Sequence, residues 1–441
     1  MKKNNFHKVL LGGALLCLII FLIITLTAGL PSAGPFLIAF FLLLAIGVRG
    51  FEATKSFSYT IAIFTAVTAS MFYPQYFTHL GSFKLSLLIV PLLQIIMFGM
   101  GSQMSLDDFT GVIKMPKGVL IGVSAQFTIM PLTALAISKL LHFPPEIAAG
   151  IILIGCAPSG LASNVMSYIA RANLPLAVTI GAVATILAPF LTPLLMKLLG
   201  GQFIEVNFWS MMLDILNMII LPIVAGFIFN MFYNKKENNR KSMLIQLLVY
   251  AVIILGTNLI YLTSDTATSE QFFTALMQSV FWFFLLPIVG AIALKHILKG
   301  NRKVIEECLS FLSMAGIAVI IVIITAAGRD SLLEVGALLL LSSLLHNLIG
   351  YTLGYNFARL FKLPEKDRRT IALEVGMQNG GLASGLAMQM GKIATVGLAP
   401  AVFGPLMNIT GSVLASWWRG KIPAEDLQTE QTDKQEDLHD N

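Results

Sequence analysis

The hydrophobic positions of this sequence form long runs that are separated by short polar connections. Fourteen runs, found with a window of about 19 residues, are candidates to cross roughly 30 Å of hydrocarbon. This pattern predicts an all-α polytopic membrane protein with about 14 transmembrane spans, of which the second is short enough to be a re-entrant segment. The runs lie at about 9–29, 35–49, 56–73, 84–104, 117–138, 146–170, 174–196, 208–232, 243–262, 272–297, 308–327, 332–358, 369–391 and 395–418.

Two of these runs are interrupted by residues that weaken a helix. The sixth run contains Pro158, Ser159 and Gly160, and the thirteenth contains Gly380 and Gly381. The tetrapeptide Gly-Leu-Ala-Ser follows in both, and each broken run precedes one last span of its half of the chain. Paired broken helices in corresponding positions indicate a transport site between inverted repeats.

Composition and charge agree with a chain surrounded by lipid. Hydrophobic residues make up 56% and charged residues only 12%, against roughly 25% charged residues in soluble domains. If the N-terminus is inside, 24 Lys and Arg residues fall in inside connections and 5 fall outside. This asymmetry predicts an even number of spans, a multi-pass protein of the cell (inner) membrane, and cytoplasmic N- and C-termini. A cleaved signal peptide at the start would break the alternation.

The same charge distribution argues against a polyanion as partner. The net charge of +6 comes from basic residues that are scattered over short connections and form no stripe. We therefore expect the lipid bilayer, and no nucleic acid, as a partner. The oligomeric state is left open.

Glu374 is the ionisable residue that most needs an explanation, because a charge inside a span is costly. Two carboxamides, Gln378 and Asn379, and a glycine pair follow it within eight residues. Oxygen ligands without thiol or imidazole suit a hard cation such as Na⁺. The N-termini of half-helices at the breaks would favour an anionic group of a substrate. The alternative is a structural glutamate that is hydrogen-bonded within the bundle.

Several stretches resemble the signature sequences of the bile acid:sodium symporter family, in the order in which that family has them. The resemblance covers about residues 56–418, and the last stretch is the most specific. The stretches are Ile96 to Asp108 (IMFGMGSQMSLDD), Val119 to Pro131 (VLIGVSAQFTIMP), Gly155 to Arg171 (GCAPSGLASNVMSYIAR), His346 to Gly354 (HNLIGYTLG) and Ile371 to Ala383 (IALEVGMQNGGLA).

The resemblance implies two inverted five-helix repeats, a panel and a core domain, and two crossed broken helices. The fourteen predicted spans are four more than the ten of the family. The similar stretches 221–224 and 286–289 leave open which helix pair is inserted. The expected division is an additional N-terminal helix pair (1–55), the first repeat (56–207), the first helix of the second repeat (208–242), an inserted helix pair (243–303), the remainder of the second repeat (304–420) and a disordered cytoplasmic tail (421–441).

The resemblance also implies site residues. One sodium site would use Gln126, Glu374, Val375, Met377 and Gln378, with backbone oxygens at Val375 and Met377. A second would use Ser163, Asn164 and Glu374, together with two hydroxyls at positions that here hold Ala177 and Gly181. The second site therefore departs from the family pattern. The expected substrate contacts are Asn164, Asn379 and the residues at the breaks, Pro158, Gly160, Gly380 and Gly381.

The function that we expect is sodium-coupled symport of an organic anion, either bile-acid-like or a small monocarboxylate such as pantoate or pantothenate. A proton-coupled or uniport carrier, in which Glu374 titrates, is the alternative. A receptor or a channel fits less well. We do not expect an enzyme, because His346 is the only histidine well inside a span and no catalytic motif accompanies it.

Overall fold

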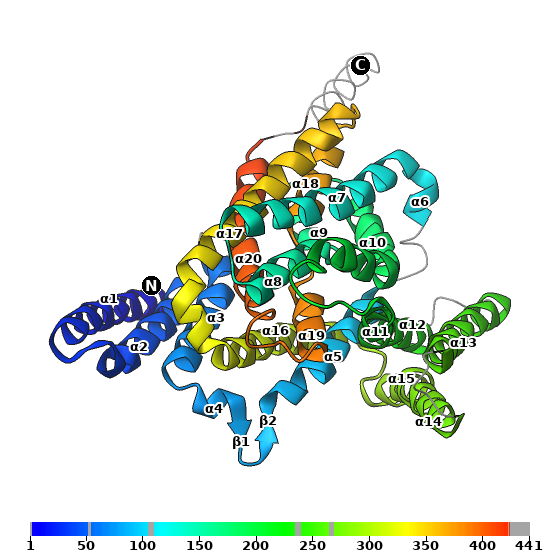
Figure 1. The fold of residues 1–441 in the computed structure, drawn as a ribbon, viewed down its shortest axis with the longest axis horizontal. Coiled ribbons are helices and arrows are strands. Elements are labelled where there is room, and N and C mark those ends of the chain that lie inside the picture. The colour runs from blue at the N-terminus through cyan, green and yellow to red at the C-terminus, as the bar shows by residue number, and fades with distance from the viewer. Residues whose placement is uncertain are drawn as a thin grey trace.

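The computed structural model describes residues 2–51, 54–104, 110–233, 240–263, 269–421 and Pro423. Within them the chain is almost entirely helical (Figure 1), with one short hairpin of β1 (His79–Leu80) and β2 (Phe83–Lys84). Eleven helices are long and apolar enough to cross a membrane, which confirms a multi-span membrane protein. Most of the predicted tail and the end of the 96–108 stretch lie outside the described residues.

These eleven helices coincide with eleven of the fourteen predicted spans. The second span is a continuous helix of 19 residues, which is long enough to cross a membrane. In chain order the elements are α1 (Lys2–Ala28), α2 (Leu30–Val48), η2 (Leu85–Leu88) with α5 (Ile89–Gln103), α7 (Pro116–Leu140), α10 (Leu174–Leu195) with η4 (Met196–Gly200), α11 (Phe208–Ile215) with η5 (Leu216–Ile220) and α12 (Leu221–Tyr233), α13 (Arg240–Thr263), α14 (Ser269–Val280) with η6 (Phe281–Leu285) and α15 (Leu286–Ile297), α16 (Arg302–Ala327), α17 (Arg329–Leu360) and α20 (Leu398–Arg419).

The other three predicted spans are shorter or broken. The third is α3 (Ser58–Phe72), with 15 residues. The sixth is divided into α8 (Pro145–Cys156) and α9 (Ala162–Ile169), as the sequence predicts. The thirteenth is divided into α18 (Glu365–Gly376) and α19 (Gly380–Gln389), so that Gly380 and Gly381 begin a helix instead of breaking one. Short helices connect the spans: η1 (Lys55–Phe57), α4 (Gln75–Thr78) and α6 (Gly111–Lys114).

Two helix hairpins lie at opposite sides of the molecule in Figure 1. The pair α1 and α2 packs mainly on itself and reaches the rest of the chain through α3. Helices α13 to α15 pack on α11 and α12. Between the hairpins, α12 packs directly against α5, where a Cβ atom on Gly101 would lie only 2.2 Å from the carbonyl oxygen of Ile223. This close approach makes α12 part of the central bundle, and α15 packs against α12.

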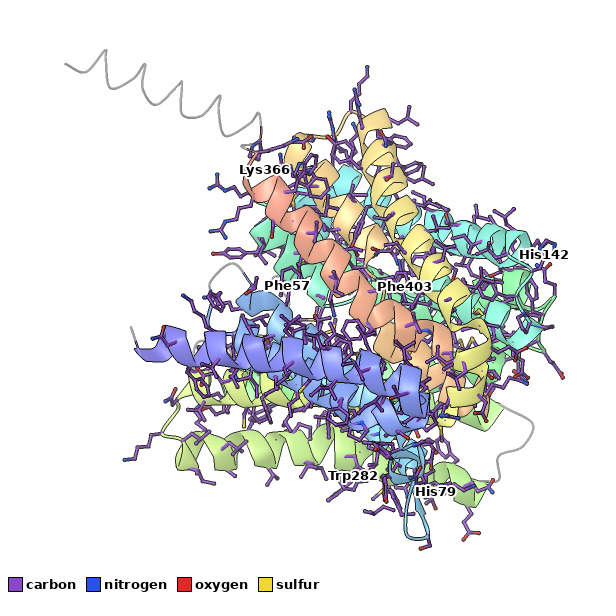
Figure 2. The ribbon with its side chains drawn as sticks, turned by 90° about the vertical axis from the view of Figure 1, so that its left-hand side faces the viewer. Phe57, His79, His142, Trp282, Lys366 and Phe403 are labelled. Atoms are coloured by element: carbon purple, nitrogen blue, oxygen red, sulfur yellow. The ribbon has the colours of Figure 1, made fainter. Side chains whose placement is uncertain are left out.

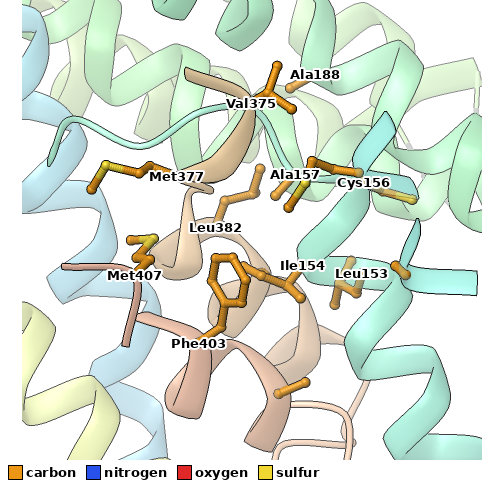
Figure 3. Packing of buried hydrophobic residues seen from close by; sticks show 14 of the residues in the cluster. Leu153, Ile154, Cys156, Ala157, Ala188, Val375, Met377, Leu382, Phe403 and Met407 are labelled. Atoms are coloured by element: carbon orange, nitrogen blue, oxygen red, sulfur yellow. The ribbon is translucent and has the colours of Figure 1, made fainter. Parts of the chain in front are cut away.

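The centre of the bundle is apolar and contains both broken helices. All of α8 from Ile147 to Cys156 is buried. Figure 3 shows side chains of α8, of the α18–α19 segment and of α20 packed together, among them Ile154, Leu382 and Phe403. Figure 2 shows Phe403 inside the bundle and Trp282 on its outside, in keeping with exposed fractions of 1% and 56%. The core therefore holds the two breaks at the centre of the molecule.

Candidate functional site

The two breaks cross each other and pair through their backbones. The segment between α8 and α9 runs antiparallel to the segment between α18 and α19, with Ser159 opposite Gln378. Such pairing satisfies backbone groups that lipid would leave without partners. The bonds run from Gly160 N to the Met377 oxygen (2.9 Å) and from Asn379 N to the Pro158 oxygen (2.8 Å).

Local sequence explains why the chain unwinds at these points. Ala157 is extended, because the ring of Pro158 disfavours helical dihedral angles in the residue before it. A Cβ atom on Gly160 would lie 2.7 Å from the carbonyl oxygen of Gln378, so only glycine permits the close approach of the two segments. The side chain of Asn379 accepts a hydrogen bond from Leu382 N at 3.0 Å and caps the new helix α19.

Side chains from three neighbouring helices hold the last carbonyl groups before the breaks. Thr192 of α10 donates to the Cys156 oxygen at 2.8 Å. Asn347 of α17 donates to the Gly376 oxygen at 2.7 Å, and Gln126 of α7 donates to the Ala157 oxygen at 2.9 Å. Of the three, only Gln126 was expected from the sequence. Thr192 and Asn347 are polar residues in apolar spans, which is the one signal that could have indicated them.

The residues expected to form the first sodium site come together at the crossing and are fully buried. Gln126 Nε2 donates to Gln378 Oε1 at 2.7 Å, although the two residues are 252 positions apart. Gln378 Nε2 in turn donates to the Val375 oxygen at 2.6 Å. The Met377 oxygen accepts the bond from Gly160. The amide orientations follow from this hydrogen-bond network.

Glu374 lies in the same segment, and neither of its carboxylate oxygens has a hydrogen-bond partner within 3.5 Å among the described residues, although the hydroxyls of Ser159 and Ser163 lie near it. Its side chain is fully buried. Ser159 Oγ and Gln126 Oε1 are likewise buried without a partner in the described part of the chain. An unpaired charge in such surroundings costs several kcal/mol, so this carboxylate requires a cation or a proton.

Helix α10 presents a glycine to Glu374. A Cβ atom on Gly181 would lie 3.6 Å from Glu374 Oε2 and 3.5 Å from Ser159 Oγ. The nearby hydroxyls of Thr179 and Thr185 donate to carbonyl oxygens of their own helix, at 2.8 and 2.7 Å. Helix α10 therefore offers no hydroxyl at position 181.

The remaining residues expected for the second sodium site are close to the break in α8–α9. Ser163 is buried and donates to the Gly160 oxygen at 2.7 Å. Asn164 Oδ1 is buried and has no partner among the described residues. Ala177 is fully buried and offers no side-chain oxygen.

A cavity of about 110 Å³ adjoins the crossing. Four expected substrate contacts line it, namely Gly160, Asn379, Gly380 and Gly381, whereas Pro158 and Asn164 are not part of the described lining. Two polar residues that the sequence did not indicate, Ser384 and Asn408, also line it. The rest is mostly apolar and comes from α3, α5, α9, α16 and α20: Ile63, Ile96, Met97, Leu161, Ala162, Ile317, Ile320, Ile321, Pro400, Gly404, Pro405 and Met407, together with Gln378.

The described residues contain no group of three or more His, Cys, Asp and Glu side chains that could hold a metal ion. Sites for transition metals use imidazole and thiolate ligands. The crossing offers carboxylate, carboxamide, hydroxyl and backbone oxygens, which suit a hard cation.

The sequence is similar to known transporters over most of its length. The model of the sodium bile acid symporter family matches residues 90–271. A sodium-dependent transporter of Bacillus subtilis (strain 168), YocS, named as uncharacterized, is 33% identical over 371 residues, which cover 84% of this chain and 92% of the relative.

Two further relatives come from a plant and from an animal. The probable chloroplastic sodium/metabolite cotransporter BASS1 of Arabidopsis thaliana is 32% identical over 76% of this chain and 67% of its own length. The ileal sodium/bile acid cotransporter of Homo sapiens is 27% identical over 70% of this chain and 71% of its own length.

This chain is likewise a transporter and not an enzyme. It belongs to the sodium bile acid symporter family.

Proposed function

We propose that this protein is a secondary active transporter that couples the uptake of an organic anion to sodium by alternating access. The observation that carries the proposal is the fully buried, unpartnered carboxylate of Glu374 beside two crossed breaks. A sodium ion would neutralise this charge within a shell of oxygen ligands.

The oxygen atoms proposed as sodium ligands still have lone pairs that are not used in hydrogen bonds. The oxygens of Gln378 and Val375 each accept one hydrogen bond here, and a carbonyl oxygen has two lone pairs. Gln126 Oε1 accepts none from the described residues. These oxygens, the Met377 oxygen and Glu374 form the first ion site that we propose. The second would have Ser163, Asn164 and Glu374 and lack a hydroxyl at positions 177 and 181.

The cavity supports an organic anion as substrate. Its described lining has no Lys or Arg, so negative charge would be held by the N-terminus of α19, where Gly381 lies. The N–H groups of Gly380 and Leu382 already donate, to the Gln378 oxygen and to Asn379 Oδ1. The isoleucine side chains of α3, α5 and α16 would contact the apolar part of the molecule. A small monocarboxylate of the pantoate or pantothenate type and a bile-acid-like anion are the two classes proposed.

Coupling would follow from the segment that the two ligands share. Residues 375–378 would hold sodium, and the adjoining Asn379 lines the cavity. Sodium would fix the unwound backbone that the anion contacts, and by linkage each ligand would raise the affinity for the other. Alternating access would require the crossing and the wall formed by α3, α5 and α16 to move relative to each other.

The ends of the broken helices support an inverted-repeat division. At one end Glu146, which begins α8, forms an ion pair with Lys392 beyond α19. At the other end Asp367, near the start of α18, accepts a hydrogen bond from Asn173 beyond α9 at 2.8 Å. Each broken helix thus begins against the end of the other. We propose that the repeats are 56–207 and 208–420, with 243–303 as an insertion, which includes most of α13 and all of α14 and α15, and 1–55 as an addition.

We propose that the protein lies in the cell membrane and that both of its termini are in the cytoplasm. This orientation is supported by the 24 Lys and Arg residues in connections on one side, against 5 on the other.

Proteoliposomes with the purified protein test the proposed function. An inward sodium gradient should concentrate a labelled monocarboxylate or bile acid against its own gradient, and potassium should not replace sodium. A proton-coupled carrier is the second candidate, because a proton would also neutralise Glu374. Accumulation that follows a pH gradient in sodium-free buffer would favour that candidate and contradict sodium coupling.

A further inference from the structure

A second cavity, of about 360 Å³, lies between α17, α18 and α20. It shares no lining residue with the cavity at the crossing. Its walls are aromatic and polar, formed by Tyr351, Thr352, Tyr355, Asn356, Glu365, Arg369, Leu414, Trp417, Trp418 and Lys421.

This cavity is located where three helices end. Helix α17 ends at Leu360, α18 begins at Glu365 and α20 ends at Arg419. Arg369 ties these ends together, because its Nη1 donates to the carbonyl oxygens of Trp418 at 3.2 Å and Lys421 at 3.0 Å. Tyrosine and tryptophan side chains at the ends of spanning helices are typical of the boundary between lipid and water. We therefore expect the cavity at the level of lipid headgroups.

The charge that the cavity leaves uncompensated is positive. Glu365 is balanced by Arg369, whose Nε donates to it at 2.9 Å, and it also accepts a hydrogen bond from Tyr355 at 2.6 Å. Lys421 has no ion pair with the described residues, and its Nζ lies 3.7 Å from the centroid of the Trp417 ring. The indole thus holds an exposed ammonium group at the cavity.

The aromatic rings do not form a free cage for a cationic ligand. The Trp417 ring already faces Lys421, and the guanidinium of Arg369 lies 5.8 Å from the centroid of Trp418. A ligand cation would compete with two residues of the chain itself. The chemistry that remains is that of an anion.

Several residues that line the cavity are exposed on the surface of the bundle. Thr352 and Asn356 are exposed on α17, and Trp417 is 54% exposed on α20. Val413, one turn before Trp417, is exposed as well. An occupant with a negative headgroup and apolar chains would match both parts of this surface.

We propose that this cavity binds the headgroup of an anionic phospholipid of the phosphatidylglycerol type. The phosphate would lie against Lys421, and the acyl chains would run along the exposed face of α20. Basic pockets between spanning helices at a membrane surface bind anionic headgroups in this way. Further basic residues at the same ends of these helices would attract such lipids: Arg359, Lys366, Arg368 and Arg419.

Thermal unfolding of the full-length protein in a neutral detergent tests this proposal. Titration with dioleoylphosphatidylglycerol should raise the melting temperature more than titration with dioleoylphosphatidylcholine. Lys421→Gln should weaken the apparent affinity for phosphatidylglycerol about fivefold, the loss expected for one lysine near an anionic headgroup. Lys362→Gln is the matched control, because this exposed lysine near the end of α17 does not line the cavity.

Three outcomes would overturn the proposal. The first is an equal effect of the two lipids on the unaltered protein. The second is an unchanged phosphatidylglycerol titration in Lys421→Gln, provided that this variant melts like the unaltered protein without lipid. The third is stabilisation by inorganic phosphate or glycerol 3-phosphate to the same extent as by the lipid, which would indicate a site for a soluble anion.

Discussion

At the scale of single residues, the crossing is defined by oxygen atoms that have no partner. Most polar groups near the breaks are satisfied by one another, as the bonds of Gln126 and Gln378 illustrate. Several oxygens are not, and Glu374 is the charged group among them, since neither of its oxygens is bonded to the described residues. A buried carboxylate without a partner lowers the stability of the fold, so its presence is best explained by the ligand that it binds.

Replacing this carboxylate tests that reasoning directly. Glu374→Gln keeps the shape and removes the charge, so we expect sodium-driven uptake to fall to the level of empty liposomes while the melting temperature is kept or rises. Glu334→Gln, which alters an exposed carboxylate of α17, should leave uptake unchanged. Undiminished uptake in Glu374→Gln would contradict the proposed ion site.

The glycine that faces Glu374 allows a gain-of-function test. Gly181→Ser would place a hydroxyl beside Glu374. The new Cβ atom would lie 3.6 Å from Glu374 Oε2, which is an ordinary contact distance, so the serine fits without a clash. We expect a lower half-saturating sodium concentration for uptake, because the ion gains an oxygen ligand. Gly181→Ala adds the same Cβ atom without the hydroxyl and is the control. Equal sodium dependence in both variants would show that position 181 does not contact the ion.

At the scale of elements, the two breaks form a single unit. The sequence predicts the first break correctly because Pro158 acts on its own neighbours. It places the second at Gly380 and Gly381, whereas the chain unwinds at residues 377–379 and the two glycines start α19. Asn379 decides this boundary by capping the helix, and its backbone partner across the bridge, Pro158, is 221 residues away.

The contact between the two breaks leaves no room for a side chain at Gly160. Gly160→Ala would bring a Cβ atom to 2.7 Å from the Gln378 oxygen, so the bridge would have to separate. We expect a loss of uptake and a destabilisation of about 1–3 kcal/mol, the usual cost of overpacking. Gly256→Ala on α13 is the control, because a Cβ atom there has nothing within 4 Å. The measurement is thermal unfolding together with uptake, and normal values for Gly160→Ala would contradict a tight crossing.

At the scale of the whole molecule, the peripheral hairpins are separate from the crossing. Helix α1 packs on α2, and α2 reaches the bundle through α3. No residue of α1 or α2 lines either cavity described above. Both hairpins add helices in pairs, so the direction of every other span is independent of them.

Removal of the first hairpin is therefore a test of the molecule as a whole. A chain without residues 2–51 should insert with its remaining spans unchanged and keep sodium-dependent uptake, since an even number of spans is lost. Its melting temperature should fall, because the face of α3 that α2 covers would be uncovered. Cysteine accessibility at the connections and tracer uptake are the measurements. Intact insertion with abolished uptake would show that the hairpin takes part in transport.

The residues of the site could be predicted from the sequence only in part. The motif resemblance indicated Gln126 and Gln378, which the fold brings to 2.7 Å from each other. It assigned no role to Thr192, Asn408 or Asn347, although Asn347 lies in the stretch from His346 to Gly354. A single polar residue in an apolar span has no local pattern that separates it from a packing residue. The roles of these three residues depend on which helix lies opposite, and that information is distributed over the whole chain.

The sequence by itself determined the membrane class, the position of the spans and the existence of two breaks. These properties follow from hydropathy and from proline and glycine, which act over a few neighbouring residues. Only the tertiary structure decided that Ser159 faces Gln378, that α10 offers Gly181 to Glu374, and that α3, α5 and α16 form the apolar wall of the cavity. Such facts are distances between segments far apart in the chain, and packing of the complete bundle fixes them.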